Sequence, residues 1–177
     1  MLNPRTATRV ILAAAMAFVI LMFLATVSAH GAMCPDSLKR YERTDFIKQA
    51  QWSSTRKMLL SARQRSTGGW TDAYTGKVIR GADSVDVDHV VALAYAFRIG
   101  ACQWSTAQKR MFANDSVNLL LTRDSINTSK SDKSVSGWLP PRNACAFVRR
   151  WLSVTRKYGL APTQQDSVVL RNCKLVK

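Results

Sequence analysis

The sequence predicts a single α+β domain in which two short strands lie among helices. Polar and β-branched residues alternate over 84–88, which is typical of a strand, and a second short apolar run follows at 117–122. Apolar residues recur at helical spacing elsewhere, most clearly over 142–158. With 177 residues and a hydrophobic fraction of 47%, the chain can bury one sizeable core, and its composition argues against intrinsic disorder.

The first half of the predicted domain is mostly helical. Apolar residues three to four positions apart predict each helix, and Ser105 is expected to cap the last of them. The expected elements are, in order, a helix at 45–65, an irregular stretch or short hairpin at 70–79, the strand at 84–88, and helices at 92–99 and 105–113.

The second half begins with the strand at 117–122 and continues in helices. Asp124 is expected to cap the first helix, and Gly159 is expected to end the amphipathic one. The predicted helices lie at 124–130, at 142–158, and from Pro162 toward Cys173.

The N-terminus has the pattern of a secretory signal. Residues 1–9 carry two arginines and no acid, and residues 10–29 are almost wholly apolar and end in small residues. Cleavage near Ala29 would leave residues 30–177 as the mature domain, in a secreted, periplasmic or otherwise extracytoplasmic location. The alternative is an uncleaved membrane anchor at 10–29, because about 20 apolar residues span a bilayer.

Four cysteines lie beyond this segment, and an even number in an exported chain predicts two disulfides. Three pairings are possible, and spacing does not decide among them. The pairing that we expect joins Cys102 to Cys145 and Cys34 to Cys173. No CxxC motif occurs, so a thiolate zinc site has little support.

The charge of the chain indicates its partners. A formal net charge of +15 and a pI near 10.4 favour binding to a polyanion, such as nucleic acid, acidic lipid or anionic polysaccharide. The alternative is a basic surface that serves solubility alone. Because the only histidines are His30 and His89, a three-histidine zinc site is excluded.

The most informative short motif is Asp86-Val87-Asp88-His89, which ends a predicted strand. A histidine beside carboxylates suits a general base, and the carboxylates suit a hard cation. The alternative is a structural histidine with an incidental acid beside it.

A second stretch strengthens the functional interpretation. Asn118 opens the second predicted strand, and Asn127 lies in the helix that follows, where its amide oxygen could reach a cation held by Asp88. Lys130 lies three residues later on the same helical face, so a cation and an ammonium together would form a phosphate site. The alternative role for Asn127 is that of a turn or cap residue.

These motifs resemble those of the HNH (His-Me finger) endonucleases. The run from Asn118 to Asp132 is also similar to the HNH domain of RNA-guided CRISPR nucleases. Over residues 56–160 the chain resembles exported HNH-family proteins related to the C-terminal nuclease domain of GmrSD-type restriction enzymes. The matching runs include Tyr74-Thr75-Gly76, 86–93, 112–115, 127–133 and 138–141.

The resemblance implies a ββα-metal core at about 84–133, with a helical insertion between the strands and further helices around it. It implies His89 as general base, Asp88 and Asn127 as ligands of one divalent ion, and Asn118 as the residue that fixes the loop bearing His89. Mg²⁺ is the expected ion, with Mn²⁺ or another divalent ion as alternatives. Asp86 is expected to accept a hydrogen bond from a metal-bound water. The expected nucleic-acid contacts are Arg56, Arg123, Lys130 and Lys133.

The implied activity is hydrolysis of phosphodiester bonds in nucleic acid, with DNA as the expected substrate, low sequence specificity and a monomeric enzyme. The chain departs from the family at Asn127, where histidine also occurs, and at Ala92, where proline is common. A first alternative is an inactive HNH scaffold that binds nucleic acid or another polyanion. A second is a copper enzyme that uses an N-terminal His30 with His89.

Overall fold

The computed structural model describes residue 34 and residues 40–64, 69–81 and 84–177. The predicted signal or anchor segment lies outside these residues. Within them, no helix has the length and apolar character needed to cross a bilayer.

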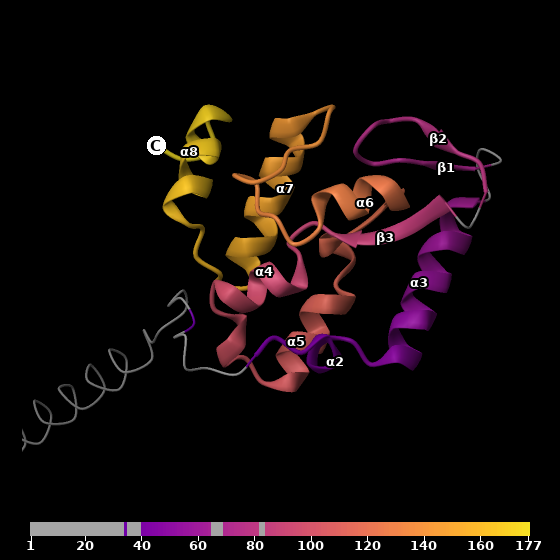
Figure 1. The fold of residues 1–177 in the computed structure, drawn as a ribbon, viewed down its shortest axis with the longest axis horizontal. Coiled ribbons are helices and arrows are strands. Elements are labelled where there is room, and N and C mark those ends of the chain that lie inside the picture. Colours follow the sequence, from indigo (N-terminus) through magenta and orange to yellow (C-terminus); the bar gives the residue numbers. More distant parts are fainter. Residues whose placement is uncertain (1–33, 35–39, 65–68, 82–83) are drawn as a thin grey trace, which may run out of the picture. The chain divides into compact units, whose positions relative to one another are not determined.

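The described chain is a mixture of short strands and helices, as the sequence predicts (Figure 1). The N-terminal elements are α2 (Arg43–Phe46), α3 (Gln49–Gln64), β1 (Trp70–Thr71), β2 (Val78–Ile79), β3 (Val85–His89), α4 (Leu93–Arg98) and the 3-10 turn η2 (Ala101–Gln103). The C-terminal elements are α5 (Thr106–Asn114), η3 (Ser116–Asn118), β4 (Leu119–Arg123), α6 (Asp124–Lys130), α7 (Ala144–Lys157) and α8 (Gln164–Asn172).

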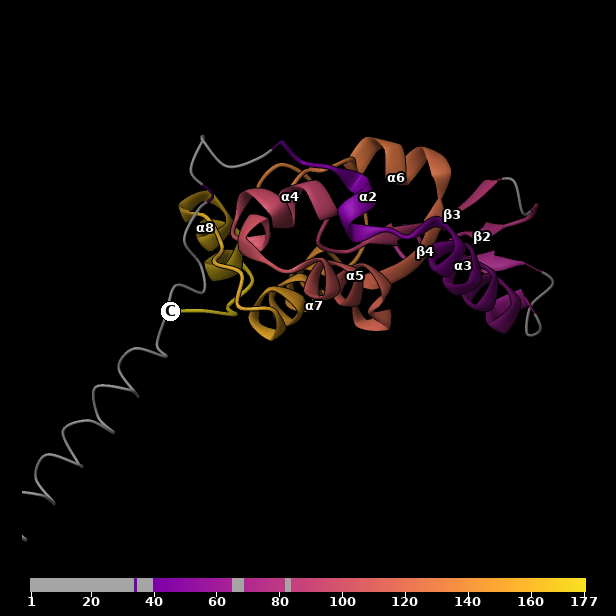
Figure 2. The same ribbon diagram turned by 90° about the horizontal axis from the view of Figure 1, so that it is seen from below.

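The antiparallel pair of β3 and β4 carries the site. Its register sets Val85 opposite Arg123 and His89 opposite Leu119. Val85 and Val87 face a small apolar cluster that includes Trp70 of β1. Because side chains alternate along a strand, the intervening carboxylates of β3 face away from this cluster. Helix α6 follows β4 directly and packs on both β3 and β4. In Figure 2, α6 lies at the top of the molecule and α7 at the bottom.

The predicted hairpin is confirmed, and a buried carboxylate fastens it to β4. Strands β1 and β2 pair around a turn in which Gly76 has a φ of 71°, a conformation that favours glycine. The Asp72 carboxylate accepts hydrogen bonds from the main-chain nitrogens of Tyr74 and Arg123 and from the Thr122 hydroxyl. These bonds hold the β1–β2 hairpin against β4, and they thereby place Tyr74 beside β3 and β4.

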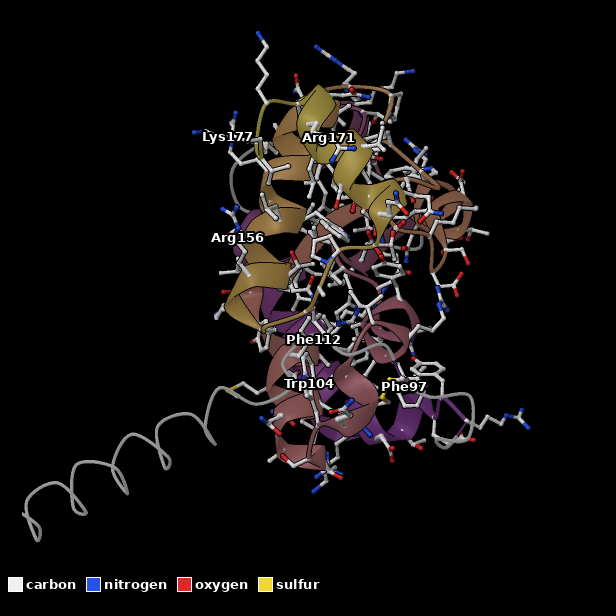
Figure 3. The ribbon with its side chains drawn as sticks, turned by 90° about the vertical axis from the view of Figure 1, so that its left-hand side faces the viewer. Phe97, Trp104, Phe112, Arg156, Arg171 and Lys177 are labelled. Atoms are coloured by element: carbon white, nitrogen blue, oxygen red, sulfur yellow. A yellow bond between two sulfur atoms is a disulfide. The ribbon has the colours of Figure 1, made fainter. Side chains whose placement is uncertain are left out.

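The larger core is formed by the remaining helices. Helix α7 buries Phe147, Trp151 and Val154 along one side, which confirms its predicted amphipathic character. In the same cluster, the rings of Trp104 and Phe112 meet edge to face with centroids 5.3 Å apart (Figure 3). The predicted Ser105 cap is also confirmed, since its hydroxyl accepts from the main-chain nitrogen of Gln108.

The expected disulfide pairing was wrong, although all four cysteines are bonded. Cys34 pairs with Cys102, and Cys145 pairs with Cys173. Helix α8 packs along α7, so that its C-terminal cysteine meets the first turn of α7, with a Cα–Cα distance of 5.3 Å. The pairing therefore depends on how α8 docks, which cysteine spacing does not encode.

Two local predictions also required correction. The single helix expected over 45–65 is interrupted at Ile47, whose extended backbone (φ −118°, ψ 112°) allows both Phe46 and Ile47 to be buried in the core. Asp124 is the first residue of α6 and not its cap. Arg123 occupies the cap position, and its side chain makes no capping hydrogen bond. The Asp124 carboxylate still lies in the first turn of α6, where negative charge is favourable.

Candidate functional site

The imidazole of His89 is fixed by two neighbours. Its Nε2 lies 2.8 Å from the main-chain oxygen of Ala113, and its ring stacks on the indole of Trp52 with centroids 5.0 Å apart and planes 18° apart. Because a carbonyl only accepts, Nε2 carries the hydrogen, and Nδ1 keeps a lone pair. Burial is the main cause that lowers the pKa of His89, to about 3, so the ring is neutral at neutral pH.

Asn118 holds the chain segment that follows His89. Its buried side chain accepts a hydrogen bond from the main-chain nitrogen of Val91 at 2.8 Å and donates one to the Val91 oxygen at 3.3 Å. Its own main-chain oxygen accepts from the nitrogen of Val90 at 2.8 Å. These three bonds hold Val90 and Val91, the two residues that follow His89, against Asn118.

The Asp88 carboxylate is buried between two donors. The hydroxyl of Tyr74 donates to Oδ2 at 2.5 Å, and the ammonium of Lys130 donates to Oδ1 at 3.0 Å. Burial raises the pKa of Asp88 above its ordinary value, although Lys130 and Tyr74 act in the opposite direction by favouring the ionised form. Burial and the neighbouring Asp88 charge raise the pKa of Tyr74, so its hydroxyl remains protonated.

Asp86 and Asn127 face each other across β3 and α6. The Asn127 amide nitrogen donates to Asp86 Oδ2 at 2.7 Å, which turns the Asn127 oxygen away from that bond. Within the described chain, no donor to this oxygen is found. The Arg56 guanidinium on α3 lies 3.9 Å from Asp86 Oδ1 and donates to the Val85 main-chain oxygen at 3.0 Å.

One pocket brings the predicted residues together. Asp86, Asp88, His89 and Asn127 all line it, although they come from a strand and a helix about forty positions apart in the sequence. Trp52 lies in the wall of the same pocket. The structure therefore gathers one neutral imidazole, two carboxylates and one amide oxygen around a space that is open to solvent.

Comparison with known proteins identifies the family. Residues 37–172 match the sequence profile described as "GmrSD restriction endonucleases, C-terminal domain". The chain belongs to this family. The GmrSD C-terminal domain is of nuclease type, and it accounts for most of the chain, including every residue that lines the pocket.

A curated relative extends the comparison. This GmrSD C-terminal domain is 36% identical over 109 residues to a protein of Arthroderma benhamiae named "Uncharacterized secreted protein". The match covers 59% of this chain and 53% of the relative, so the chain spans about half the length of the curated relative that it matches. No solved structure matches the chain.

The donors in the pocket suit a hard divalent cation. Asp86, Asp88 and Asn127 offer oxygen atoms, which are the ligands that Mg²⁺ and Mn²⁺ prefer. Among the described residues, no cluster of three or more histidine, cysteine, aspartate or glutamate side chains is suited to hold a metal. A cation here would therefore depend on the amide of Asn127 and on water, which Mg²⁺ readily retains.

The predicted nucleic-acid contacts lie in different settings. Lys130 is 1% exposed and lies beneath the pocket, so in this arrangement it cannot touch a phosphate. Lys133 is exposed, and its ammonium donates to the Ser129 main-chain oxygen at 2.6 Å. Arg123 is half-buried at the start of α6, and Arg56 lies beside Asp86 as described. None of these four lines the pocket among the described residues.

The sequence analysis assigned no role in this site to three residues, although Tyr74 lies in one of the runs that carry the family resemblance. Trp52 and Tyr74 are an apolar position of a helix and a turn residue in the sequence, and only the fold brings them to His89 and Asp88. Arg43 is an exposed cation in the pocket wall. The excess of basic residues was a signal for cations of this kind, but it could not distinguish Arg43 from the others.

Proposed function

We propose that this chain is an exported, metal-dependent endonuclease that hydrolyses phosphodiester bonds in nucleic acid, with DNA as substrate and little sequence specificity. The observation that carries the proposal is the meeting of His89, Asp88 and Asn127 at one pocket. Membership of a nuclease-type family supports the class of reaction. Together with β3, β4 and α6, this arrangement supports a ββα-metal core at 84–133.

In this proposal His89 is the general base. Its Nε2–H is engaged by the Ala113 oxygen, so Nδ1 is the atom that takes a proton from water. The ring keeps its orientation because that bond and the stacked indole of Trp52 restrict its rotation. Asn118 fixes the segment after His89, and thereby the position of the base at the end of β3.

The proposed step is an in-line displacement at phosphorus. The water oxygen forms a bond to phosphorus while its proton passes to His89. The bond from phosphorus to the 3′ oxygen breaks, and that oxygen takes a proton from solvent. The products carry a 5′-phosphate and a 3′-hydroxyl, and His89 returns its proton to solvent.

Asp88 and Asn127 are the residues proposed to hold one divalent ion, with Mg²⁺ as the first candidate and Mn²⁺ as the second. When bound, such an ion supplies positive charge that stabilises the charge developing on the phosphate and the leaving oxygen. Asp86 orients Asn127 through the 2.7 Å hydrogen bond from its amide nitrogen. Two ligating side chains are too few for a second ion, so one ion is proposed.

Cations around the pocket are proposed to hold the substrate backbone. Arg43 lines the pocket, and Arg56, Arg123 and Lys133 lie on the elements that form it or next to them. Contacts of this kind act on phosphates and carry no base sequence, which supports low specificity. The net charge of +15 favours the same partner over long range.

Two observations support export. Both described disulfides require an oxidising compartment to form and persist, and the fungal relative is named as a secreted protein. The N-terminal 29 residues are proposed to be a signal that is removed near Ala29. The mass of the exported chain tests this directly, because an uncleaved anchor would retain the segment.

The test is nicking of supercoiled plasmid by the purified exported chain in Mg²⁺ or Mn²⁺, with and without EDTA. We expect nicking that EDTA abolishes and that His89→Ala lowers about 10²- to 10⁴-fold, the usual contribution of a general base. His30→Ala is the matched control and should leave the rate unchanged. Plasmid binding without nicking in either metal would instead favour an inactive polyanion-binding scaffold, and loss of activity in His30→Ala would favour the copper alternative.

A further inference from the structure

Two buried side chains hold the Asp88 carboxylate from opposite sides. We propose that Tyr74 and Lys130 are positioning residues that fix this carboxylate for the metal, an inference that rests on the proposed function. Tyr74 donates to one carboxylate oxygen at 2.5 Å and Lys130 to the other at 3.0 Å. Both partners are 1% exposed, so water cannot replace either bond.

Lys130 also ties together the two elements that carry the proposed ligands. Its ammonium donates to the main-chain oxygen of His89 at 2.7 Å as well as to Asp88. Lys130 is the last residue of α6, and Asn127 lies one turn earlier on the same helix. One ammonium therefore sets the end of β3 against α6, and with it the position of Asp88 relative to Asn127.

Such burial is unusual for a lysine, which is almost never fully buried unless it is paired. Removing an ammonium from water carries a large desolvation cost, which only well-placed partners offset. Here two oxygens from one end of β3 are those partners. A lysine whose role was to bind phosphate would have its ammonium at the surface, so burial favours positioning.

Tyr74 reaches Asp88 from the β1–β2 hairpin, and its ring is itself held in place. The ring meets Trp138 and Phe147 edge to face, with centroids 5.0 Å and 5.4 Å away. The hydroxyl therefore occupies a fixed position under the carboxylate. Because the ring packing does not involve the hydroxyl, Tyr74→Phe removes the hydrogen bond and keeps the packing.

The matched control for Tyr74→Phe is Tyr95→Phe. The hydroxyl of Tyr95 also donates to a buried carboxylate, that of Asp166, but neither residue lines the pocket. Both variants should fold with similar melting temperatures. Calorimetric titration with Mn²⁺ should show about tenfold weaker binding in Tyr74→Phe, the usual lower limit for loss of a residue that orients a ligand, and no change in Tyr95→Phe.

The matched control for Lys130→Met is Lys109→Met. Lys109 is 7% exposed and pairs with Asp45 at 3.2 Å, outside the pocket. Mn²⁺ binding should weaken in Lys130→Met and stay unchanged in Lys109→Met. Tighter Mn²⁺ binding in Lys130→Met would show that the ammonium competes with the metal, and would overturn the proposal for this residue. If Lys130→Met does not fold, Tyr74→Phe alone decides.

The plasmid assay distinguishes failure of this inference from failure of the proposed function. If the unaltered chain nicks DNA and Tyr74→Phe binds Mn²⁺ as Tyr95→Phe does, positioning by Tyr74 is refuted and the nuclease stands. If Tyr74→Phe weakens Mn²⁺ binding but no variant nicks DNA, positioning stands and the nuclease is refuted. Absence of any Mn²⁺ binding by the unaltered chain overturns both.

A separate observation concerns the surface formed by α7, α8 and the C-terminal residues. Residues 133–177 contain a single acid, Asp166, and it is fully buried. The exposed side chains of this segment therefore include basic residues and no acid. The basic residues are Lys133, Arg142, Arg149, Arg150, Arg156, Lys157, Arg171, Lys174 and Lys177.

Three arginines lie at exposed positions of α7 and α8. Arg149 and Arg156 lie seven residues apart on α7 and so project from the same side, and Arg171 lies near the end of α8. All three are exposed, and within the described chain none of their guanidinium groups has a hydrogen-bond or ion-pair partner. Figure 3 shows Arg156, Arg171 and Lys177 on this side of the molecule. No residue of α7 or α8 lines the pocket.

We infer that this arginine surface, defined by Arg149, Arg156 and Arg171, binds the phosphate backbone of duplex DNA outside the pocket. The two arginines of α7 are separated by about 10 Å along the helix, close to the Debye length, so their fields add. Guanidinium groups suit phosphate through paired hydrogen bonds. A lipid surface is a poorer fit, because the outward residues of α7 (Arg149, Ser153 and Arg156) offer no large apolar side chain for insertion and the only large apolar side chain that α8 exposes is Val168.

The test compares two triple variants of equal charge in the His89→Ala background with EDTA, so that no DNA is cleaved. One is Arg149→Gln/Arg156→Gln/Arg171→Gln, and the control is Lys48→Gln/Lys77→Gln/Arg80→Gln, also at exposed positions. Each phosphate contact contributes about 0.9 to the slope of log Kd against log salt concentration. The slope should therefore fall by about 2 to 3 in the first variant and by less than about 1 in the control. Equal losses, or a loss confined to binding of anionic lipid vesicles, would overturn the inference.

Discussion

Replacing Asn118 with alanine removes the side chain that holds the segment after His89. Asn118 is fully buried, and both of its side-chain bonds go to the main chain of Val91. The substitution leaves the Val91 nitrogen and oxygen without these partners. Each buried unsatisfied group costs about 1–3 kcal/mol, so the free energy of unfolding should fall by about 3 kcal/mol or more. The melting temperature should then fall by on the order of 10 °C.

Urea unfolding followed by tryptophan fluorescence measures this loss, with Asn114→Ala as the matched control. The Asn114 side chain also makes two hydrogen bonds, to Arg110 and Thr55, but it is only half-buried and lies outside the pocket. We expect a loss of about 1 kcal/mol for Asn114→Ala. The nicking rate of the folded Asn118→Ala protein should also fall. A loss of stability no larger than that of Asn114→Ala would refute the reasoning.

Three further predictions follow from the same structure. Burial raises the pKa of Asp166, but hydrogen bonds led by the one from Ser134 together hold it below the ordinary 3.8. The ionised Asp166 carboxylate therefore stabilises the fold above about pH 4, and this stabilisation is lost as the pH falls through the folded-state pKa. The urea midpoints at pH 7 and pH 3 should differ less in Asp166→Asn than in the unaltered chain. Replacing Cys145 and Cys173 with serine opens a loop with a sequence separation of 28 and should cost about 3–4 kcal/mol in calorimetry; an unchanged melting temperature would contradict this. Trp52→Leu removes the ring stacked on the imidazole and should lower kcat with little change in KM, whereas a change confined to KM would point to substrate binding instead.

The strands and the short motifs could be predicted because their signals are local. Alternation over 84–88 predicts β3, and the strand and helix after it predict that Asn127 returns toward Asp88. The role of Asn118 beside His89 is implied by the family resemblance. Residues this close in sequence leave few possible arrangements. The arrangement of β3, β4 and α6 is therefore encoded within about 45 residues of the sequence.

The remaining features depend on long-range packing. A lysine at position 130 is expected at the surface, and only the docking of α6 on β3 shows that its ammonium is buried against Asp88. Tyr74 reaches the same carboxylate because Asp72 fastens the hairpin to β4. The correct partner of Cys173 is likewise set by the packing of α8 along α7.

The most direct test of the central claim is diffraction from crystals soaked in Mn²⁺, with data collected at the manganese absorption edge. The account predicts one anomalous peak in the pocket, within coordinating distance of oxygen atoms of Asp88 and Asn127, and no such peak in crystals of Asp88→Ala. A peak at other residues only, or an empty pocket at Mn²⁺ concentrations that support nicking, would contradict it.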